Sequence, residues 1–155
     1  MRIAFDSSAI FKRYSREKGR DEVAAAFDKA SAICVAPHLK LEVLTSASRL
    51  LRDKLLDASS HQWLLNQLAE DLDSWEVMPF SMAVESASLR AVEAVRVRAM
   101  DALHVGAAIV ARVDLFVTAD KRQADASRAM NIPTQLVEAV STRRRFKTDI
   151  YVLHH

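Results

Sequence analysis

Cysteine and glycine are both scarce in this chain of 155 residues, and each shortage argues against a class of site. The single cysteine, Cys34, can form neither an internal disulfide nor a cysteine-based zinc site, and we expect it to be a small buried side chain. The only two glycines, Gly19 and Gly106, cannot build a glycine-rich phosphate-binding loop, and the chain has no G-x-S-x-G motif. Enzymes that depend on those motifs are therefore disfavoured.

Long apolar runs are missing as well. No stretch reaches the roughly 18 consecutive apolar residues of a membrane span, and the opening segment Met1–Asp6 lacks the apolar region of a signal peptide. We therefore expect no membrane contact and a cytoplasmic location. The length suits one domain, which we place at residues 1–150. A short tail at 151–155 follows, and its final His154 and His155 could come from a purification tag.

An excess of charge of either sign is also absent, because the formal net charge is only +2. That value is too small to indicate nucleic-acid binding by itself. Basic residues nevertheless gather in two segments, at 12–20 and 143–147. A solvated surface is the commoner role of such segments, and contact with phosphate is the alternative.

Short apolar runs alternate with segments of helical periodicity along the chain. We expect strands at 3–5, 33–36, 77–80, 115–118 and 135–137, with Pro79 confining the third to an edge or an end. We expect helices over 7–19, over 23–30, after residue 37, over 64–72, over 84–95, and from about 101 and 121. This alternation predicts an α/β fold with a mostly parallel sheet that is covered on both faces.

Several local expectations accompany these elements. Gly19 should end the first helix in a left-handed conformation, and Pro37 should lie in the first turn of the third helix. Ser59 or Ser60 should cap the fourth helix. The helix from about residue 101 should be buried almost all round, because residues 105–111 are all apolar. The apolar face of the third helix is predicted to consist of Leu41, Leu44, Ser48 and Leu51.

Four acidic residues lie where they could form a site. Asp6 directly follows the first strand, Asp120 lies two residues beyond Thr118 of the fourth strand, and Asp101 opens the buried helix. Ligands of parallel α/β sheets bind at the carboxyl ends of the strands. Each acid also has a plainer interpretation, because the three aspartates could cap helices and Glu42 could be a solvated helix residue.

The combination of these acids carries more weight than any one of them. Two carboxylates about 4 Å apart repel by about 4 kcal/mol at an effective dielectric of roughly 20, and several together raise one another's pKa values. A divalent cation removes the conflict, and oxygen-only ligands favour Mg²⁺ or Mn²⁺ over zinc or copper. The acids that we expect to converge on one cation are Asp6, Glu42, Asp101 and Asp120.

The histidines and tryptophans are assigned mainly structural roles. His104 lies one turn after the third acid and could face the same site, although packing or surface exposure is the commoner role of a helical histidine. His38 and His61 offer no ligand spacing. Trp63 and Trp75 are expected to pack in the core and not to stack on nucleic-acid bases.

Four segments of the chain resemble motifs of the PIN-domain ribonucleases, in particular the VapC-like toxins of bacterial toxin–antitoxin pairs. They are the opening strand with its acid, Ile3–Ser8; the helical Glu42; the segment Met100–Ala108; and the segment Phe116–Arg122. The third segment is the most specific match. The four occur in the expected order over nearly the whole chain.

The resemblance implies a three-layer α/β/α sandwich and cleavage of single-stranded or looped RNA, with Mg²⁺ or Mn²⁺ held by the same four acids. It implies that the Thr118 hydroxyl supports the site and that Ser7 or Ser8 orients Asp6 or the substrate. It also implies a homodimer and a small antitoxin that blocks the site. Some members carry a further acid after the fourth, and Asp125 lies slightly late for that role.

An acidic pocket repels RNA, so basic side chains beside it would have to attract the substrate. We expect Lys12, Arg13 and Arg122 to do this. Two other functions stay open. A phosphohydrolase with Asp6 as covalent nucleophile usually needs a second aspartate two residues on, where this chain has Ser8. A catalytically silent module that binds RNA or protein would have no need of a crowded carboxylate pocket.

Overall fold

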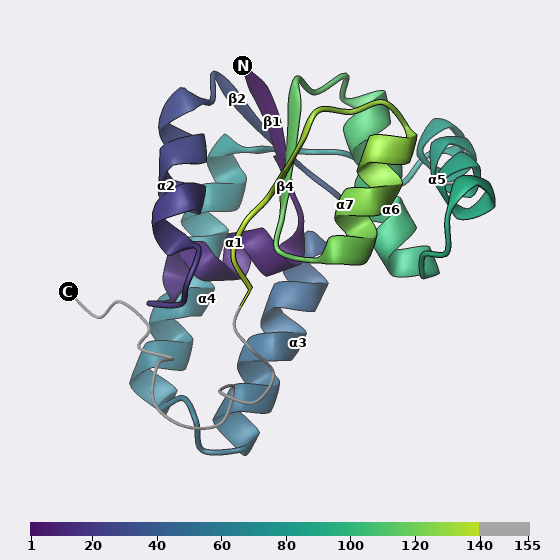
Figure 1. Ribbon diagram of the computed structural model, residues 1–155. Coiled ribbons are helices and arrows are strands. Elements are labelled where there is room, and N and C mark those ends of the chain that lie inside the picture. The colour runs from purple at the N-terminus through teal and green to yellow at the C-terminus, as the bar shows by residue number, and fades with distance from the viewer. Residues whose placement is uncertain (140–155) are drawn as a thin grey trace.

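The computed structural model describes residues 1–139 (Figure 1). The expected domain end at residue 150, the tail at 151–155 and the basic segment at 143–147 lie outside the described residues. The strands are β1 (Arg2–Phe5), β2 (Ala32–Val35), β3 (Glu76–Val77), β4 (Leu115–Thr118) and β5 (Thr134–Leu136). The helices are α1 (Ser7–Tyr14), α2 (Arg20–Lys29), α3 (Leu39–Arg52), α4 (Ala58–Ser74), α5 (Met82–Ala94), α6 (Ala99–Val110) and α7 (Lys121–Ala129).

All the strand pairs are parallel, and the strands lie in the order β3-β2-β1-β4-β5. The chain builds outward from β1 to β3 on one side and then crosses to β4 on the other side of β1. The strand order therefore reverses between β1 and β4. Such a switch point is where open α/β sheets bind their ligands, and the carboxyl ends of these two strands carry Asp6 and Asp120.

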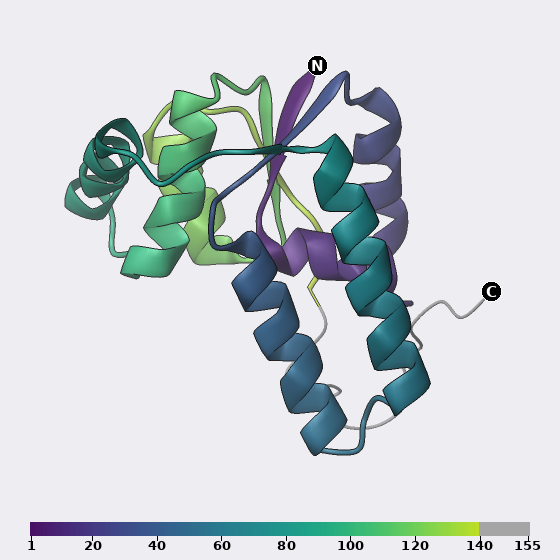
Figure 2. The same cartoon turned by 180° about the vertical axis from the view of Figure 1, so that it is seen from behind.

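Alternate strand residues face opposite layers of helices, which gives the predicted three-layer sandwich (Figures 1 and 2). Ile3 and Phe5 of β1 belong to a core that includes side chains of α1, α2, α3 and α4. Ala4, between them, belongs to a second core with α5, α6 and α7. The mostly parallel α/β fold predicted from the alternation of apolar runs is confirmed.

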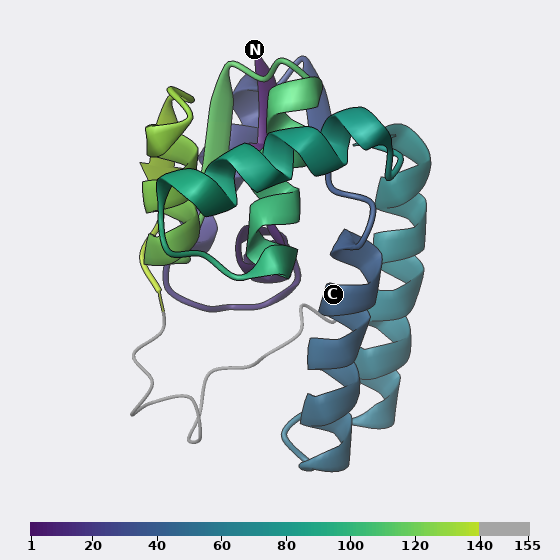
Figure 3. The same cartoon turned by 90° about the vertical axis from the view of Figure 1, so that its right-hand side faces the viewer.

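Helices α3 and α4 run side by side as a hairpin that extends beyond the sheet, and α5 lies across the outer side of α6 (Figure 3). The contact between α5 and α6 depends on Gly106, because a Cβ there would lie 2.0 Å from the Ser88 Oγ. As expected, most of α6 is buried, and Cys34 is a buried free thiol. Trp63 and Trp75 pack against the first core, as predicted. None of the helices within residues 1–139 is both long and apolar enough to span a bilayer.

Several local predictions were wrong. Helix α1 ends at Tyr14 and not at Gly19. Gly19 does have the predicted left-handed conformation, with a φ of 86°, but it precedes α2. Pro37 lies in the turn before α3 and not inside its first turn. The buried face of α3 is one residue out of phase with the predicted one, so that Leu41 is 69% exposed. The residues that α3 buries are Leu39, Val43 and Ala47.

Two caps and one strand also differ from the predictions. Asp57, and neither Ser59 nor Ser60, caps α4, by accepting a hydrogen bond from the Ser60 backbone N–H. Strand β3 is an edge strand as predicted, but it ends at Val77, before Pro79. Helix α6 begins at Ala99, which places Asp101 inside its first turn and leaves that carboxylate free of a capping role.

Candidate active site

Asp6 is completely buried at the point where β1 passes into α1. Its Oδ1 caps the helix by accepting from the Ala9 backbone N–H at 2.9 Å. The Ser8 hydroxyl lies 2.8 and 2.9 Å from its two oxygens, and the Thr118 hydroxyl donates to Oδ2 at 2.6 Å. Burial raises the pKa of Asp6, and the charge of His104 and the bond from Thr118 oppose that rise. The carboxylate is thus fixed in one orientation.

The same two hydroxyls connect β1 to the end of β4. The Ser8 Oγ accepts from the Ala119 backbone N–H and the Thr118 Oγ1 accepts from that of Asp120, each at 2.9 Å. Each hydroxyl therefore accepts from the β4–α7 loop and donates to the carboxylate that ends β1. The position of Asp120 relative to Asp6 is fixed by these bonds across the strand switch point.

Asp120 and Asp101 lie close together, at the starts of α7 and α6. Asp120 caps α7 by accepting from the Arg122 and Gln123 backbone N–H groups at 2.8 and 3.0 Å. The Gln123 side chain in turn donates to Asp101 Oδ1 at 3.2 Å. The capping interpretation of Asp6 and Asp120 is correct, and it holds together with their placement at the sheet edge.

Glu42, in the first turn of α3, accepts hydrogen bonds at one carboxylate oxygen from two different elements. Its Oε1 lies 2.7 Å from the Ser7 hydroxyl and 2.5 Å from the Nε2 of His104. Burial alone would raise the pKa of Glu42, but the hydrogen bonds from His104 and Ser7 and the charges of His104 and His38 together outweigh burial and lower it. Glu42 is therefore an anchored, ionised carboxylate and not a solvated helix residue.

Asp101 shows how the four acids act on one another. Burial raises the pKa of Asp101, and the negative charge of Asp120 raises it further. Glu42 and Asp6 act in the same direction. Asp101 thus lies within electrostatic reach of the three other acids, although among the described residues no three of the four acids have ligand atoms within 4.8 Å of one another. The excess of negative charge that they share suits an oxygen-ligated divalent cation, which would offset it.

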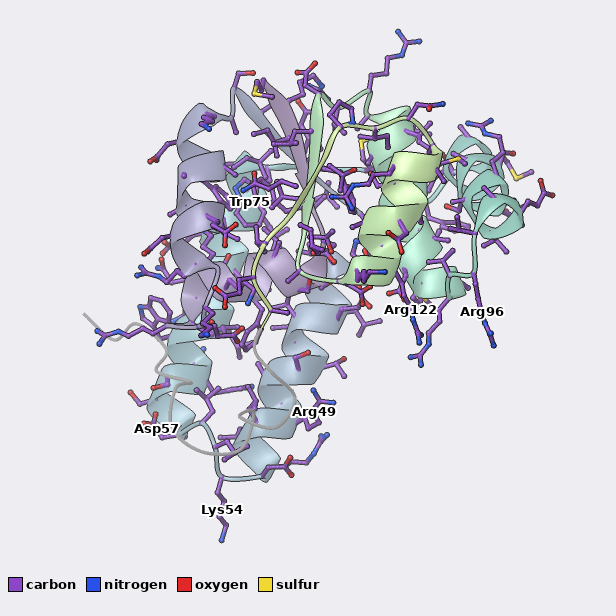
Figure 4. The ribbon with its side chains drawn as sticks, in the orientation of Figure 1. Arg49, Lys54, Asp57, Trp75, Arg96 and Arg122 are labelled. Carbon is purple, nitrogen blue, oxygen red and sulfur yellow. The ribbon has the colours of Figure 1, made fainter. Side chains whose placement is uncertain are left out.

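An open hollow of about 370 Å³ lies beside two of these acids. Asp101 and Asp120 form part of its wall, and Arg98, Lys121 and Arg122 supply the rest. In Figure 4, Arg122 projects outward from this edge of the molecule. The hollow thus combines carboxylates that can hold a cation with cationic side chains that can contact phosphate.

Comparison with known proteins identifies the family of this fold. The sequence pattern of the PIN domain family matches residues 3–129. The chain belongs to the PIN domain family. Members of this family are nucleases, so the protein is assigned to the hydrolases of nucleic acids. The proteins of curated function to which it was compared include none that matches it.

Solved structures share the PIN fold at low sequence identity. FitAB bound to an IR36 DNA fragment has a TM-score of 0.67 and 14% identity, covering 92% of this chain and 99% of its own. VapBC2 from Rickettsia felis bound to a promoter DNA fragment has a TM-score of 0.62 and 12% identity. The match covers 89% of this chain and 100% of the VapBC2 chain. A toxin–antitoxin complex from Klebsiella pneumoniae has a TM-score of 0.59 and 14% identity. The match covers 78% of this chain and 88% of the chain from that complex.

Two of the basic residues expected to attract RNA have other partners in this PIN domain. The Lys12 side chain is buried, and its Nζ donates to the Lys18 carbonyl at 2.6 Å and to Glu17 at 3.2 Å. The Arg13 guanidinium binds both carboxylate oxygens of Asp71, at 2.8 and 3.0 Å. Of the three, only Arg122 borders the hollow. Lys12 and Arg13 are therefore not among the proposed RNA contacts.

Some residues of this edge were missed or undervalued from sequence. Packing or surface exposure is the commoner role of a helical histidine, but His104 faces the site, the alternative that the sequence allows. The sequence offers no ligand spacing for His38. His38 nevertheless lies 3.3 Å from Glu42, four residues on along α3. That spacing places two side chains on one helix face and was the available signal. Gln123 and Arg98 carried no sequence signal of their own. Asp125, which was left open, pairs with Lys121 at 3.5 Å on the surface.

Proposed function

We propose that this PIN-domain nuclease is a divalent-metal-dependent endoribonuclease and the toxin of a toxin–antitoxin pair. The observation that carries the proposal is the placement of Asp6 and Asp120 just after β1 and β4, with Asp101 beside Asp120 on the wall of the hollow. Clustered carboxylates are costly to a fold without a counter-charge. Their presence at the strand switch point is explained if they hold Mg²⁺ or Mn²⁺.

The proposed ligands of the cation are Asp6, Glu42, Asp101 and Asp120. When bound, a divalent cation would supply Lewis-acid activation of the phosphodiester and of the attacking water. The protein's own part is orientation. Ser8 and Thr118 fix the carboxylate of Asp6, while Ser7 and His104 hold one oxygen of Glu42, so that these ligands need little rearrangement when a substrate arrives.

RNA is proposed as the substrate because the chain resembles PIN-domain ribonucleases. The hollow also offers basic side chains, beside its acids, to a phosphate backbone. Arg98, Lys121 and Arg122 would contact phosphate oxygens on either side of the scissile bond, which offsets the repulsion between the acids and the backbone. Contacts of this kind position a strand without reading its bases. They therefore favour cleavage whose sequence preference is set elsewhere.

The substrate and the metal can be tested together. Purified protein is incubated with a pool of single-stranded RNA or with DNA of the same sequences, in Mg²⁺, in Mn²⁺, and in EDTA. We expect internal cleavage of the RNA pool alone, lost in EDTA. Cleavage of DNA and not RNA would overturn the substrate assignment. RNA binding without cleavage would instead support the catalytically silent module.

The toxin role rests on the fold shared with the toxin–antitoxin complexes named above. We further propose a cytoplasmic homodimer that a small antitoxin inhibits. Expression of the chain in a bacterial host should arrest growth, and the Asp101→Asn variant should not. Co-expression of a short reading frame adjacent to the gene should restore growth. Normal growth under expression of active protein would indicate a housekeeping ribonuclease.

A further inference from the structure

We propose that His38, Glu42 and His104 form a transition-metal site of the class that Zn²⁺ occupies, and that its occupation withdraws Glu42 from the cation of the nuclease site. The binding half of this proposal stands on the geometry of the three side chains alone. The regulatory half rests on the proposed nuclease function.

The two imidazoles meet on one carboxylate oxygen. The Nε2 atoms of His104 and His38 lie 2.5 and 3.3 Å from Glu42 Oε1, and the ligand atoms of the three residues all lie within 4.8 Å of one another. The imidazole rings are 4.2 Å apart between centroids. Within residues 1–139 this is the only group of three histidine, cysteine or acidic side chains to meet that distance.

The group is held by two helices that pack from different layers. His38 is the N-cap residue of α3 and Glu42 lies one turn later, whereas His104 comes from α6. The side chains of His104 and His38 are 1% and 11% exposed, and that of Glu42 is 33% exposed. Three protein ligands with one side open to water is the pattern of accessible zinc sites, in which solvent completes the coordination.

The ligand set differs in chemistry from the acids beside it. Two imidazole nitrogens and one carboxylate oxygen suit Zn²⁺ and the neighbouring transition metals, whereas Mg²⁺ prefers an oxygen-only set. The two sites share Glu42 but select different cations. A Zn²⁺ ion on Glu42 Oε1 would therefore compete with the orientation that Ser7 gives this oxygen for Mg²⁺ or Mn²⁺.

The surroundings of the imidazoles limit the affinity. The Nδ1 atoms of His38 and His104 are buried and have no hydrogen-bond partner among the described residues. Metal-bound histidines normally donate from that second nitrogen, and losing such a partner costs about 10–100-fold in affinity. The His38 Nε2 must also leave the Met100 carbonyl, 2.8 Å away. We therefore expect a dissociation constant on the order of micromolar, suited to reversible occupation.

The binding test uses Co²⁺, whose visible absorption is strong in four-coordinate sites and weak in six-coordinate ones. All proteins carry His154→Ala and His155→Ala, because two adjacent histidines can bind metal by themselves. The parent is compared with His38→Gln, which keeps a donor for the Met100 carbonyl, and with His61→Gln as a matched control on α4. Far-UV circular dichroism and thermal unfolding confirm that each variant is folded.

We expect one Co²⁺ per chain with the strong absorption, displaced by equimolar Zn²⁺ but by Mg²⁺ only in large excess, because the two sites share Glu42. His38→Gln should weaken binding at least about tenfold, and His61→Gln should leave it unchanged. Glu42→Gln should weaken it as well and serves as the second variant if His38→Gln is unfolded. Equal Co²⁺ affinity in the parent and His38→Gln, or displacement by equimolar Mg²⁺, would overturn the site.

The regulatory half is tested by adding Zn²⁺ to Mg²⁺-dependent RNA cleavage. Inhibition should have its midpoint near the Zn²⁺ dissociation constant obtained by competition with Co²⁺ at the same Mg²⁺ concentration. His38→Gln should raise that midpoint at least about tenfold. Equal inhibition of parent and variant would overturn the regulation. If the parent binds Co²⁺ as predicted but cleaves no RNA, the nuclease proposal fails and the metal site stands.

Discussion

The Nε2 of His104 lies 2.5 Å from the Oε1 of Glu42, joining α6 to α3 across 62 residues of sequence. Burial raises the pKa of Glu42, and this buried imidazole makes the largest of the contributions from His104, Ser7 and His38 that together lower it. The bond fixes one oxygen of the carboxylate in place. His104 therefore acts as a positioning residue for an acid of the proposed metal site.

Replacing His104 with alanine should weaken Mn²⁺ binding and RNA cleavage by about 10–100-fold, the usual cost of losing a partner that orients a ligand. His104→Gln keeps an N–H donor and should recover part of the loss. Mn²⁺ affinity can be measured by the disappearance of the free-ion signal in electron paramagnetic resonance. Unchanged Mn²⁺ affinity in the alanine variant would show that Glu42 needs no orientation.

Thr118 has two partners that predict a loss of stability. Its hydroxyl donates to the buried Asp6 and accepts from the Asp120 backbone N–H. Thr118→Val keeps the shape but removes one donor to Asp6 and leaves the Asp120 backbone N–H without its acceptor, at a cost of about 1–3 kcal/mol. Thr118→Ser keeps the hydroxyl and is the matched control. Urea unfolding measures the difference, and equal stability of the two variants would contradict the bonding described.

The acids predict an unusual stability change in metal-free protein. The pKa of Asp101 is raised by burial and by neighbouring negative charges. The folded protein thus holds this proton more tightly than the unfolded chain, and stability falls as the pH rises above the ordinary aspartate value of about 4.

Asp101→Asn should therefore stabilise the metal-free protein, by roughly 0.5–1 kcal/mol after allowance for screening by solvent. The gain should be larger at pH 8 than at about pH 4, the ordinary aspartate value, and Mg²⁺ should reduce it by stabilising the wild type. Chemical denaturation in EDTA at the two pH values measures the effect. A variant less stable than wild type at both pH values would mean that the acids do not repel one another.

The basic wall of the hollow predicts a change in the salt dependence of RNA binding. In an inactive Asp101→Asn background, Arg122→Ala should weaken RNA binding and lower the slope of log K against log salt by about 1. Arg49→Ala is the control, because Arg49 lies on the α3–α4 hairpin, away from Arg122 (Figure 4). Equal slopes for both variants would remove Arg122 from the proposed contacts.

Much of the fold and part of the site could be predicted from sequence. The alternation of apolar runs gave the parallel sheet, and the acids that follow β1 and β4 were placed at its carboxyl edge by the topology of such sheets. The burial of Lys12 could not be predicted, because its partner carbonyl lies in the loop before Gly19. Arg13 similarly pairs with Asp71, 58 residues away.

The phase of a helix relative to its neighbours was harder still to predict. In α3, a stripe through Leu41 and another through Leu39 have similar periodicity, and only packing against the sheet and α4 selects the second. The same phase turns His38 and Glu42 towards α6. The His38–Glu42–His104 group therefore depends on a helix contact that spacing within one segment cannot reveal.

The most direct test of the central claim compares two aspartate variants in one RNA cleavage assay. Asp101→Asn removes an acid of the proposed metal site, whereas Asp125→Asn removes a surface acid that pairs with Lys121. Wild type and both variants are stripped with EDTA, then supplied with Mn²⁺ and single-stranded RNA. We predict that Mn²⁺ restores cleavage to wild type and Asp125→Asn but not to folded Asp101→Asn. Restored cleavage by Asp101→Asn would contradict the account.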